Sequence, residues 1–354
     1  MKNKKMLIVL IIVVIAVLVS VLILFNKKDK NIKIESVSSN EQVTENVLEE
    51  VNQKKDEKID IIDVNSKTRP YAIVVNNTPV AVKVQTGLNK AYLVYEIPTE
   101  GNTSRLMALY KDIQEDIAIG TIRSSRHNFI DYALESDAIY VHYGWSHYAE
   151  DDQRKGIIDY FNGLFDSPFW RDNPEGLASE HTAYTSIAKI KKAIENDEYK
   201  KESDKTILFN YNSEDVDLSN FENNKEAKKI TIPYGQSPNI TTFEYDEENK
   251  MYNRMEDGEY CIDHKTKEKV NTKNIIVQKI DYEMCSDNYY WNLKTIGSGK
   301  GYFITNGYSV PITWKKDSRE SKTKYFYENG NEIELSDGRT YVELQTNEMK
   351  LDIE

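Results

Sequence analysis

Cysteine, proline and glycine are all scarce in this chain of 354 residues. With only 15 glycines and 8 prolines, the sequence excludes collagen-like and low-complexity proteins. The two cysteines, Cys261 and Cys285, lack a Cys-x-x-Cys or paired Cys/His spacing, so we expect no metal site and no cofactor. The sequence leaves open whether they form one disulfide outside the cytoplasm or remain two buried thiols.

Positive charge is also in short supply. The chain has 46 Lys and Arg against 58 Asp and Glu, a net charge of -12. Because broad binding to a phosphate backbone needs a basic surface, we expect no nucleic-acid partner. A polyanion could bind only through a local basic pocket. Aromatic residues, in contrast, are plentiful enough for folded cores, which excludes global disorder.

One long hydrophobic run stands near the start, at residues 6–25 (MLIVLIIVVIAVLVSVLILF), with lysines on both sides. Its length matches the apolar core of a bilayer, and no cysteine lies nearby to carry a lipid. We therefore predict a signal anchor: a single transmembrane helix, a cytoplasmic tail of residues 1–5 and an extracellular C-terminal part at the cell membrane. The alternative is a signal peptide that is removed.

The rest of the chain divides by composition. Residues 26–66 have no aromatic side chain and predict a disordered tether. From 67 to 211, short apolar runs alternate with helical patterns, which indicates a mixed α/β domain. The expected strands are 71–75, 91–97, 105–110, 117–122 and 138–142, and the expected helices are 125–135, 146–154 and 185–197.

Residues 212–228 are acidic and Asn-rich, and we predict a linker there. From 229 to 350, eight short strand-like runs are separated by turn signals such as Asn306-Gly307 and Asp257-Gly258. This pattern predicts an all-β domain, either a barrel or a sandwich. The fold class is therefore α+β: a transmembrane helix and tether, then the α/β domain, then the all-β domain.

A series of motifs in one order resembles the YerB-like lipoprotein family of Gram-positive bacteria (domain of unknown function 3048, N- and C-terminal domains). The resemblance covers nearly all of the chain after the tether and implies two domains in the cell envelope, with no established reaction. Two features depart from it: no cysteine could carry the family's usual lipid, and Tyr341 stands where the family usually has tryptophan. The motifs are RPYAIVVNN (69–77), TGLNKAYLVYE (86–96), EGNTSRLMALY (100–110), GTIRSSR (120–126), DAIYVHYG (137–144), FWRD (169–172), HTAYTS (181–186), YDEENKMYNR (245–254), GSGKGYFITNG (297–307), TWKK (313–316) and GRTYVEL (338–344).

The strongest candidate for chemistry is the Arg-Ser-Ser-Arg segment at 123–126, where a strand gives way to a helix. A serine hydroxyl can cap that helix, and two guanidiniums can bind phosphate or carboxylate. Arg105 opens a neighbouring strand and can join them. The alternative is an internal ion-pair network with Glu96, Glu100 or Asp131. The candidate ligand-binding residues are Asn77, Glu96, Glu100, Arg105, Arg123, Ser124, Ser125, Arg126, His142 and His181.

Three functions follow from these residues. The first is binding of an anionic envelope ligand, such as a wall-polymer phosphate or a peptide carboxylate, by a membrane-anchored protein. The second is an enzyme that acts on cell-wall glycan with Glu96 or Glu100 and His142, because glycosidases use paired carboxylates. The third is a protein-docking module in which the edge of the β domain adds a strand from a partner.

Overall fold

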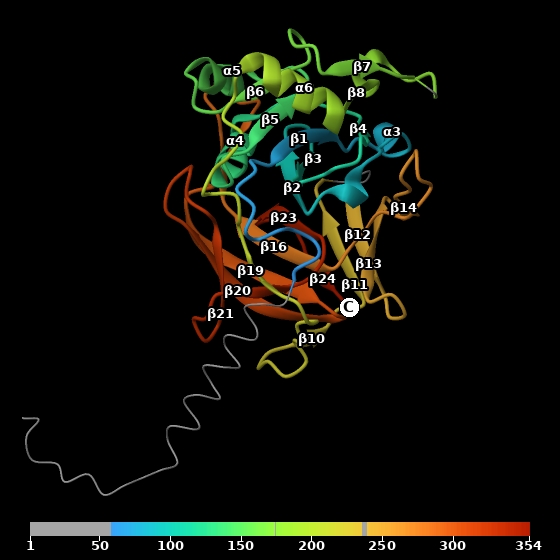
Figure 1. Cartoon of the computed structure of the whole chain (residues 1–354). Coiled ribbons are helices and arrows are strands. Elements are labelled where there is room, and N and C mark those ends of the chain that lie inside the picture. The colour runs from blue at the N-terminus through green and yellow to red at the C-terminus, as the bar shows by residue number, and fades with distance from the viewer. Residues whose placement is uncertain (1–57, 174, 236–238) are drawn as a thin grey trace, which may run out of the picture. The chain divides into compact units, whose positions relative to one another are not determined.

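The computed structural model describes residues 58–173, 175–235 and 239–354 (Figure 1). The predicted tail, anchor and most of the tether lie outside these residues. Within the described ranges, none of the helices has the length and apolar character needed to cross a bilayer.

A single sheet of 11 strands contains strands from both the N-terminal region (58–211) and the C-terminal region (229–354). The regions join where β2 pairs in parallel with β23, with Leu93 opposite Thr340 and Glu96 opposite Glu343. The sequence pattern predicted the strands of each region but not this pairing, which joins segments far apart in the chain. In spatial order the strands are β10 (Lys225–Glu226), β20 (Tyr308–Lys316), β19 (Gly297–Thr305), β16 (Asn274–Ile280), β23 (Thr340–Thr346), β2 (Leu93–Thr99), β3 (Thr103–Tyr110), β1 (Tyr71–Asn76), β5 (Ile139–His142) and β6 (Tyr160–Asn162), with β21 (Lys324–Tyr327) paired to β20.

A second sheet of six strands packs on one face of the first through the C-terminal core. Phe243 and Tyr341 meet edge to face there, with ring centroids 5.5 Å apart. The C-terminal region is thus built from strands, as predicted, but it shares its larger sheet with the N-terminal region. The second sheet comprises β14 (Glu259–Tyr260), β13 (Met251–Glu256), β12 (Ile240–Asp246), β11 (Lys229–Pro233) and β24 (Asp352–Ile353), and β15 (Asn271–Thr272) pairs with β13.

Helices gather around the N-terminal strands; in Figure 1, α3 is blue and α4, α5 and α6 are green. They are α3 (Pro79–Val82), α4 (His127–Glu135), α5 (His147–Arg154) and α6 (Ile187–Asp197), with 3₁₀ turns η1 (Leu88–Lys90) and η2 (Ser179–His181). The Ser146 hydroxyl accepts a hydrogen bond from the Ala149 amide, and the Ser186 hydroxyl accepts one from Lys189. These caps begin α5 and α6 where the sequence pattern predicted helices.

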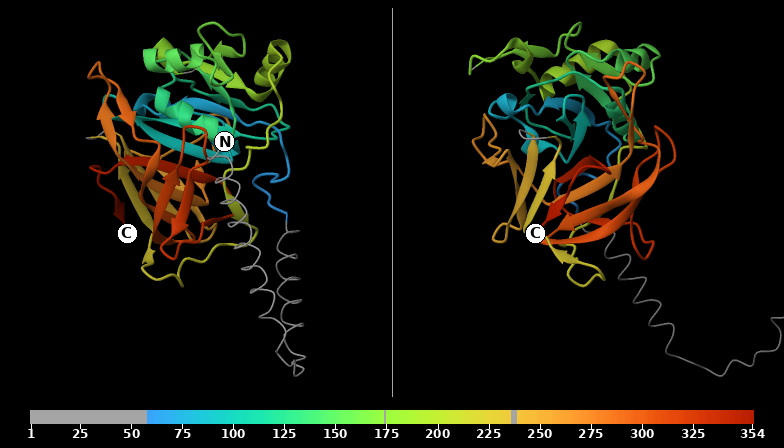
Figure 2. Two further views of the ribbon diagram at one scale, coloured as in Figure 1. Left: turned by 90° about the vertical axis from the view of Figure 1, so that its left-hand side faces the viewer. Right: turned by 180° about the vertical axis from the view of Figure 1, so that it is seen from behind.

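Three small sheets complete the fold: β4 (Ala118–Gly120), β8 (Ala183–Ser186) and β7 (Phe169–Arg171); β17 (Tyr282–Met284) with β18 (Trp291–Leu293); and β9 (Asn210–Asn212) with β22 (Glu334–Ser336). Figure 2 shows the β17–β18 hairpin in orange beside the green helices in both views. The Asn128 side chain holds it there, because it donates to the Trp291 carbonyl at 2.6 Å and accepts from the Leu293 amide at 3.0 Å.

The predicted tether (26–66) and linker (212–228) both pack against the folded core in the parts that the structure describes. In the tether, Ile62 is buried, and the amides of Asp60 and Ile61 donate to the Asp337 carboxylate at 2.7 and 2.9 Å. In the linker, Leu218 is buried and the Phe221 ring lies 4.6 Å from that of Tyr327. A few apolar side chains in a polar segment are enough to attach it to a core.

Candidate functional site

The three candidate arginines lie at the end of the large sheet where strands β1 and β5 finish. Strands β1, β5 and β6 run parallel, and β2 points the same way because β3 is antiparallel to both β1 and β2. Residues 122–125 run between the diverging ends of β1 and β5, where the Arg123 amide donates to Val74 and its carbonyl accepts from Tyr143. In sheets of this kind, ligands bind outside the carboxyl ends of parallel strands.

Glu100 is the centre of the cluster. The Arg126 Nε lies 3.1 and 2.9 Å from the two oxygens of this carboxylate, and its Nη2 contacts Oε1 as well. The Arg105 Nη2 lies 3.7 Å from Oε1, while its Nη1 donates to the Ser124 carbonyl. Two guanidiniums therefore share one carboxylate whose side chain is only 10% exposed.

Arg123 faces a different carboxylate. Its Nη2 lies 3.3 Å from Glu180 Oε1, and its Nη1 donates to the Glu180 carbonyl at 3.2 Å. Its buried Nε has no hydrogen-bond partner in the described part of the chain. The Glu180 side chain is 56% exposed, whereas that of Arg123 is 20% exposed. A largely exposed carboxylate thus covers a more buried guanidinium.

Positive charge exceeds negative charge in this cluster. Burial, together with the charges of Arg126 and Arg123, lowers the pKa of Arg105 to about 9 against the opposing effect of Glu100. Burial would raise the pKa of Glu100, but the hydrogen bond and charge of Arg126 and the charge of Arg105 outweigh it, so the pKa is lowered. An added anion would relieve the repulsion among the guanidiniums.

The two serines do not cap α4, contrary to the prediction. Arg126 occupies the N-cap position, and its side chain makes no capping bond. The Ser125 hydroxyl is buried and accepts instead from Tyr140 at 2.9 Å and from Gln153 at 3.3 Å. The Cβ of any residue replacing Gly144 would lie 3.1 Å from the Ser124 hydroxyl, which places Ser124 against the loop after β5.

The two candidate histidines have structural contacts. His142 is fully buried, and its ring nitrogens contact the Gly144 carbonyl at 2.8 Å and Gln153 Oε1 at 2.6 Å. Burial lowers its pKa to about 4, so it is neutral and holds the loop after β5. His181 lies 2.8 Å from the Asn76 amide and 3.2 Å from Glu180, so it reaches the arginine cluster through Glu180.

Glu96 and Asn77 belong to a separate buried network, which sequence reasoning did not predict. The fully buried Arg254 donates to Glu96 at 2.9 Å and to Glu256 at 2.9 Å, and Asn77 donates to Glu96 at 3.0 Å. Burial raises the pKa of Glu256 to about 7 and raises that of Glu343 well above its usual value. Glu96 is thus walled off from solvent and shares no partner with Glu100, so this geometry does not support their use as a catalytic pair.

Neither cysteine is in a disulfide: Cys261 is buried beside Arg254, and Cys285 is half-buried. Among the described residues, no group of three or more His, Cys, Asp or Glu side chains could hold a metal ion.

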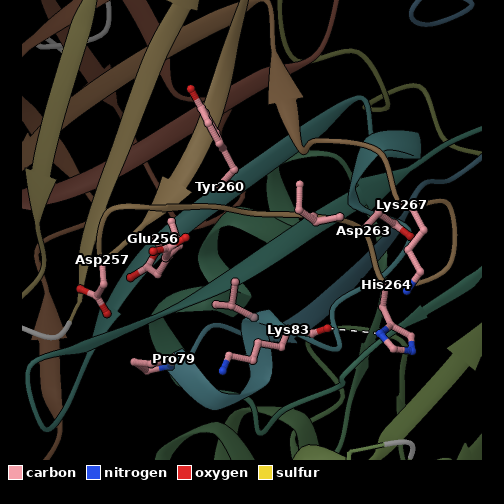
Figure 3. Close-up of a pocket in the computed structure, with 11 residues that line it drawn as sticks. Pro79, Lys83, Glu256, Asp257, Tyr260, Asp263, His264 and Lys267 are labelled. Carbon is pink, nitrogen blue, oxygen red and sulfur yellow. Dashed lines mark hydrogen bonds between the residues drawn. The ribbon is translucent and has the colours of Figure 1, made fainter.

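A cavity that the arginine cluster does not line lies between α3 and the β13–β14 turn (Figure 3). It encloses about 410 Å³. Glu256 and Asp257 stand at one end and His264 and Lys267 at the other, with the His264 Nδ1 3.2 Å from the Lys83 carbonyl. Sequence reasoning missed it because its walls come from residues 79–83 and 256–267. Most of its charged groups, such as Asp263 with Thr86 and Gly87, already hold neighbouring segments in place.

Sequence reasoning also missed Glu180 and Tyr290 at the arginine cluster. The Arg126 guanidinium lies 5.0 Å from the centre of the Tyr290 ring, on the β17–β18 hairpin. No local signal in the sequence linked this hairpin to α4, whereas Glu180 stands next to the candidate His181 and could have been noted.

Comparison with known proteins gives consistent matches along the chain. Residues 60–200 match the model "Protein of unknown function (DUF3048) N-terminal domain", and residues 230–342 match the corresponding C-terminal domain. The chain is 32% identical over 256 residues to "Putative lipoprotein YerB" of Bacillus subtilis (strain 168), which is 71% of this chain and 74% of that protein. The crystal structure of the Bacillus subtilis YerB protein superposes with a TM-score of 0.69 at 28% identity, covering 81% of this chain and 94% of that one.

Proposed function

Because this chain belongs to the DUF3048 family, whose description assigns no activity, we propose a function from its own site: binding of an anionic group of the cell envelope by the Arg105, Arg123 and Arg126 cluster. The ligand chemistry is a phosphate or a carboxylate. Both present oxygens that match the forked donors of a guanidinium. The observation that carries the proposal is the surplus of guanidinium over carboxylate: Arg105 and Arg126 share Glu100, and Arg123 has only the more exposed Glu180 among the described residues.

The proposed site is open because of how its ion pairs are distributed. The pair between Arg126 and Glu100 is nearly buried and holds the hairpin of β2 and β3 against the start of α4. The pair between Arg123 and Glu180 is more exposed, and surface pairs of this kind contribute little. An anion would therefore replace Glu180 at Arg123 while Glu100 stays in place.

The same proposal places the protein at the outer face of the cell membrane. The apolar run of residues 6–25 supports a membrane helix, and the name of the Bacillus relative, a lipoprotein, supports attachment to an envelope membrane by another route. Residues 58–354 form one compact unit, which such an anchor would hold near wall polymers. The predicted docking of a protein partner on a strand edge remains a prediction.

Isothermal titration of the purified chain with inorganic phosphate, glycerol phosphate and acetyl-D-alanyl-D-alanine tests the proposal. A charge-assisted hydrogen bond contributes about 1.5–3 kcal/mol. We therefore expect Arg123→Ala to weaken binding by about 10-fold or more. The control is Arg154→Ala, which removes an exposed arginine paired with Glu150 on α5. Binding that is absent from the wild type, or equal in Arg123→Ala and wild type, would show that the cluster is only structural.

A further inference from the structure

The cavity between α3 and the β13–β14 turn (Figure 3) is lined by a buried carboxylate that the fold satisfies only in part. The Glu256 side chain is only 4% exposed. Its Oε2 accepts hydrogen bonds from Arg254 at 2.9 Å and from Thr241 at 3.1 Å, whereas its Oε1 accepts none from the residues that the structure describes. Buried polar atoms nearly always have a hydrogen-bond partner, so the donor to Oε1 has to come from the cavity, either as solvent or as a ligand.

A cation matches this oxygen, because the network behind it holds little positive charge. The carboxylates of Glu96 and Glu256 share the guanidinium of Arg254, and Glu343 interacts with the same charges. Burial, together with the charges of Glu96 and Asp257, raises the pKa of Glu256 to about 7 against the attraction of Arg254. At neutral pH a proton therefore occupies Glu256 in about half of the molecules, and a cation at Oε1 would replace it.

The walls of the cavity add apolar surface and are attached to each other. Pro79 and Val82 contribute from α3, and Ile262, which is 37% exposed, contributes from the segment after β14. The His264 amide donates to the Gln85 carbonyl at 2.7 Å, which fixes that segment to the residues after α3. The volume of about 410 Å³ is in the range of small-molecule sites, about 300–1,000 Å³. The cavity can therefore bind a chain of several methylene groups without rearrangement of its walls.

We infer that this cavity binds a primary alkylammonium group, with the ammonium at Glu256 Oε1 and the alkyl chain along the apolar walls. An ammonium is a compact donor that needs only one free oxygen, whereas a guanidinium fork needs two. A metal ion would need several ligands, and the described residues offer no group of three. A lysine side chain of a peptide or a free amine supplies this chemistry. The site is separate from the arginine cluster and does not depend on the function proposed for it.

Calorimetric titration of the full-length chain at pH 8 with pentylamine, methylamine, pentanol and pentanoate tests this. Pentylamine is expected to bind at least about 10-fold more tightly than methylamine, because burial of one CH₂ group favours binding by about 4-fold. Glu256→Gln should weaken pentylamine binding by about 10-fold or more. Ile262→Ala should weaken pentylamine binding and leave methylamine binding unchanged. Glu247→Gln, which removes an exposed carboxylate paired with Lys228, is the control.

The pH dependence of binding identifies the carboxylate. Because a proton and the ammonium compete for Glu256, the affinity of the wild type should fall about 30-fold from pH 8 to pH 5.5, and that of Glu256→Gln should not. Histidine can also titrate near neutral pH, so His264→Asn is measured as well. If the pH dependence persists in Glu256→Gln and is lost in His264→Asn, the assignment to Glu256 is overturned. The other charged groups that face the cavity are Lys83, Asp257, Glu259, Asp263 and Lys267.

The remaining ligands test the charge and the source of the ligand. Pentanol that binds as tightly as pentylamine, or pentanoate that binds more tightly, would overturn the inference, because the cavity would then recognise no charge or the opposite one. Nα-acetyl-L-lysine amide separates the two sources: tighter binding than pentylamine supports a peptide lysine, and weaker binding supports a free amine. If Glu256→Gln is misfolded by circular dichroism, Ile262→Ala and the pH profile of the wild type decide the question.

Discussion

Replacing Glu100 with glutamine should destabilise the protein in a way that phosphate reverses. Removal of one partner from a buried ion pair costs about 3–5 kcal/mol. Because the Glu100 side chain keeps 10% exposure and Arg105 approaches only to 3.7 Å, we expect the lower end, about 3 kcal/mol. A loss of 1 kcal/mol lowers Tm by about 2–4 °C in a domain of 150–250 residues, so the fall should be about 6–12 °C.

Phosphate distinguishes a binding site from a structural ion pair in this variant. Glu100→Gln leaves the guanidiniums of Arg105 and Arg126 without their carboxylate, so an added anion has more to gain there than in the wild type. Ligand at 100 times its Kd stabilises a folded protein by about 2.7 kcal/mol. Adding phosphate should therefore reverse most of the decrease in Tm.

Differential scanning calorimetry with and without phosphate, at constant ionic strength, provides the measurement. The control is Glu150→Gln, which breaks an exposed pair with Arg154 and should change stability by less than about 0.5 kcal/mol. If phosphate raises the Tm of Glu100→Gln by no more than it raises that of the wild type, the reasoning about unbalanced charge is refuted.

Three further predictions concern the residues around the site. Arg254→Met should lower the free energy of unfolding by about 3–5 kcal/mol in urea denaturation, because it leaves the buried Glu96 and Glu256 without their cation. Between pH 4.5 and about 7, the folded chain keeps a proton on Glu256 that the unfolded chain has released, so this group makes the free energy of unfolding decrease as pH rises. In Glu256→Gln, the decrease over this pH range should be smaller than in the wild type by about 3 kcal/mol. Asn128→Ala should lower stability by about 1–3 kcal/mol and speed amide exchange in residues 282–293, because the Leu293 amide loses its acceptor; unchanged exchange in this hairpin would contradict its attachment to α4.

Local signals in the sequence predicted many of the strands and the three longer helices. β12, β13, β16 and β21 begin where alternation predicted them, and Asn306 and Gly307 turn between β19 and β20 with positive φ, as that dipeptide favours. The signals failed where pairing is long-range. The pairing of β2 with β23 joins residues more than 240 positions apart in the chain, and the periodicity of either segment does not specify its partner. Short strands such as β6 and β7 also lacked a detectable pattern.

The same limit explains why the sequence left the arginines open between a ligand site and an ion-pair network. From charge alone, each arginine is expected to pair with any carboxylate nearby. The fold determines which carboxylate is close enough. It assigns Glu96 to Arg254 and Asp131 to Arg319, so of the three carboxylates proposed for the network only Glu100 pairs with the candidate arginines, Arg105 and Arg126. What the network does not cover is Arg123, whose only carboxylate is the exposed Glu180 among the described residues. An ion pair that serves only stability gains little from pairing a guanidinium with an exposed carboxylate. A site that must release one anion and accept another needs that arrangement, and Arg123 is therefore the residue at which exchange with a ligand would begin.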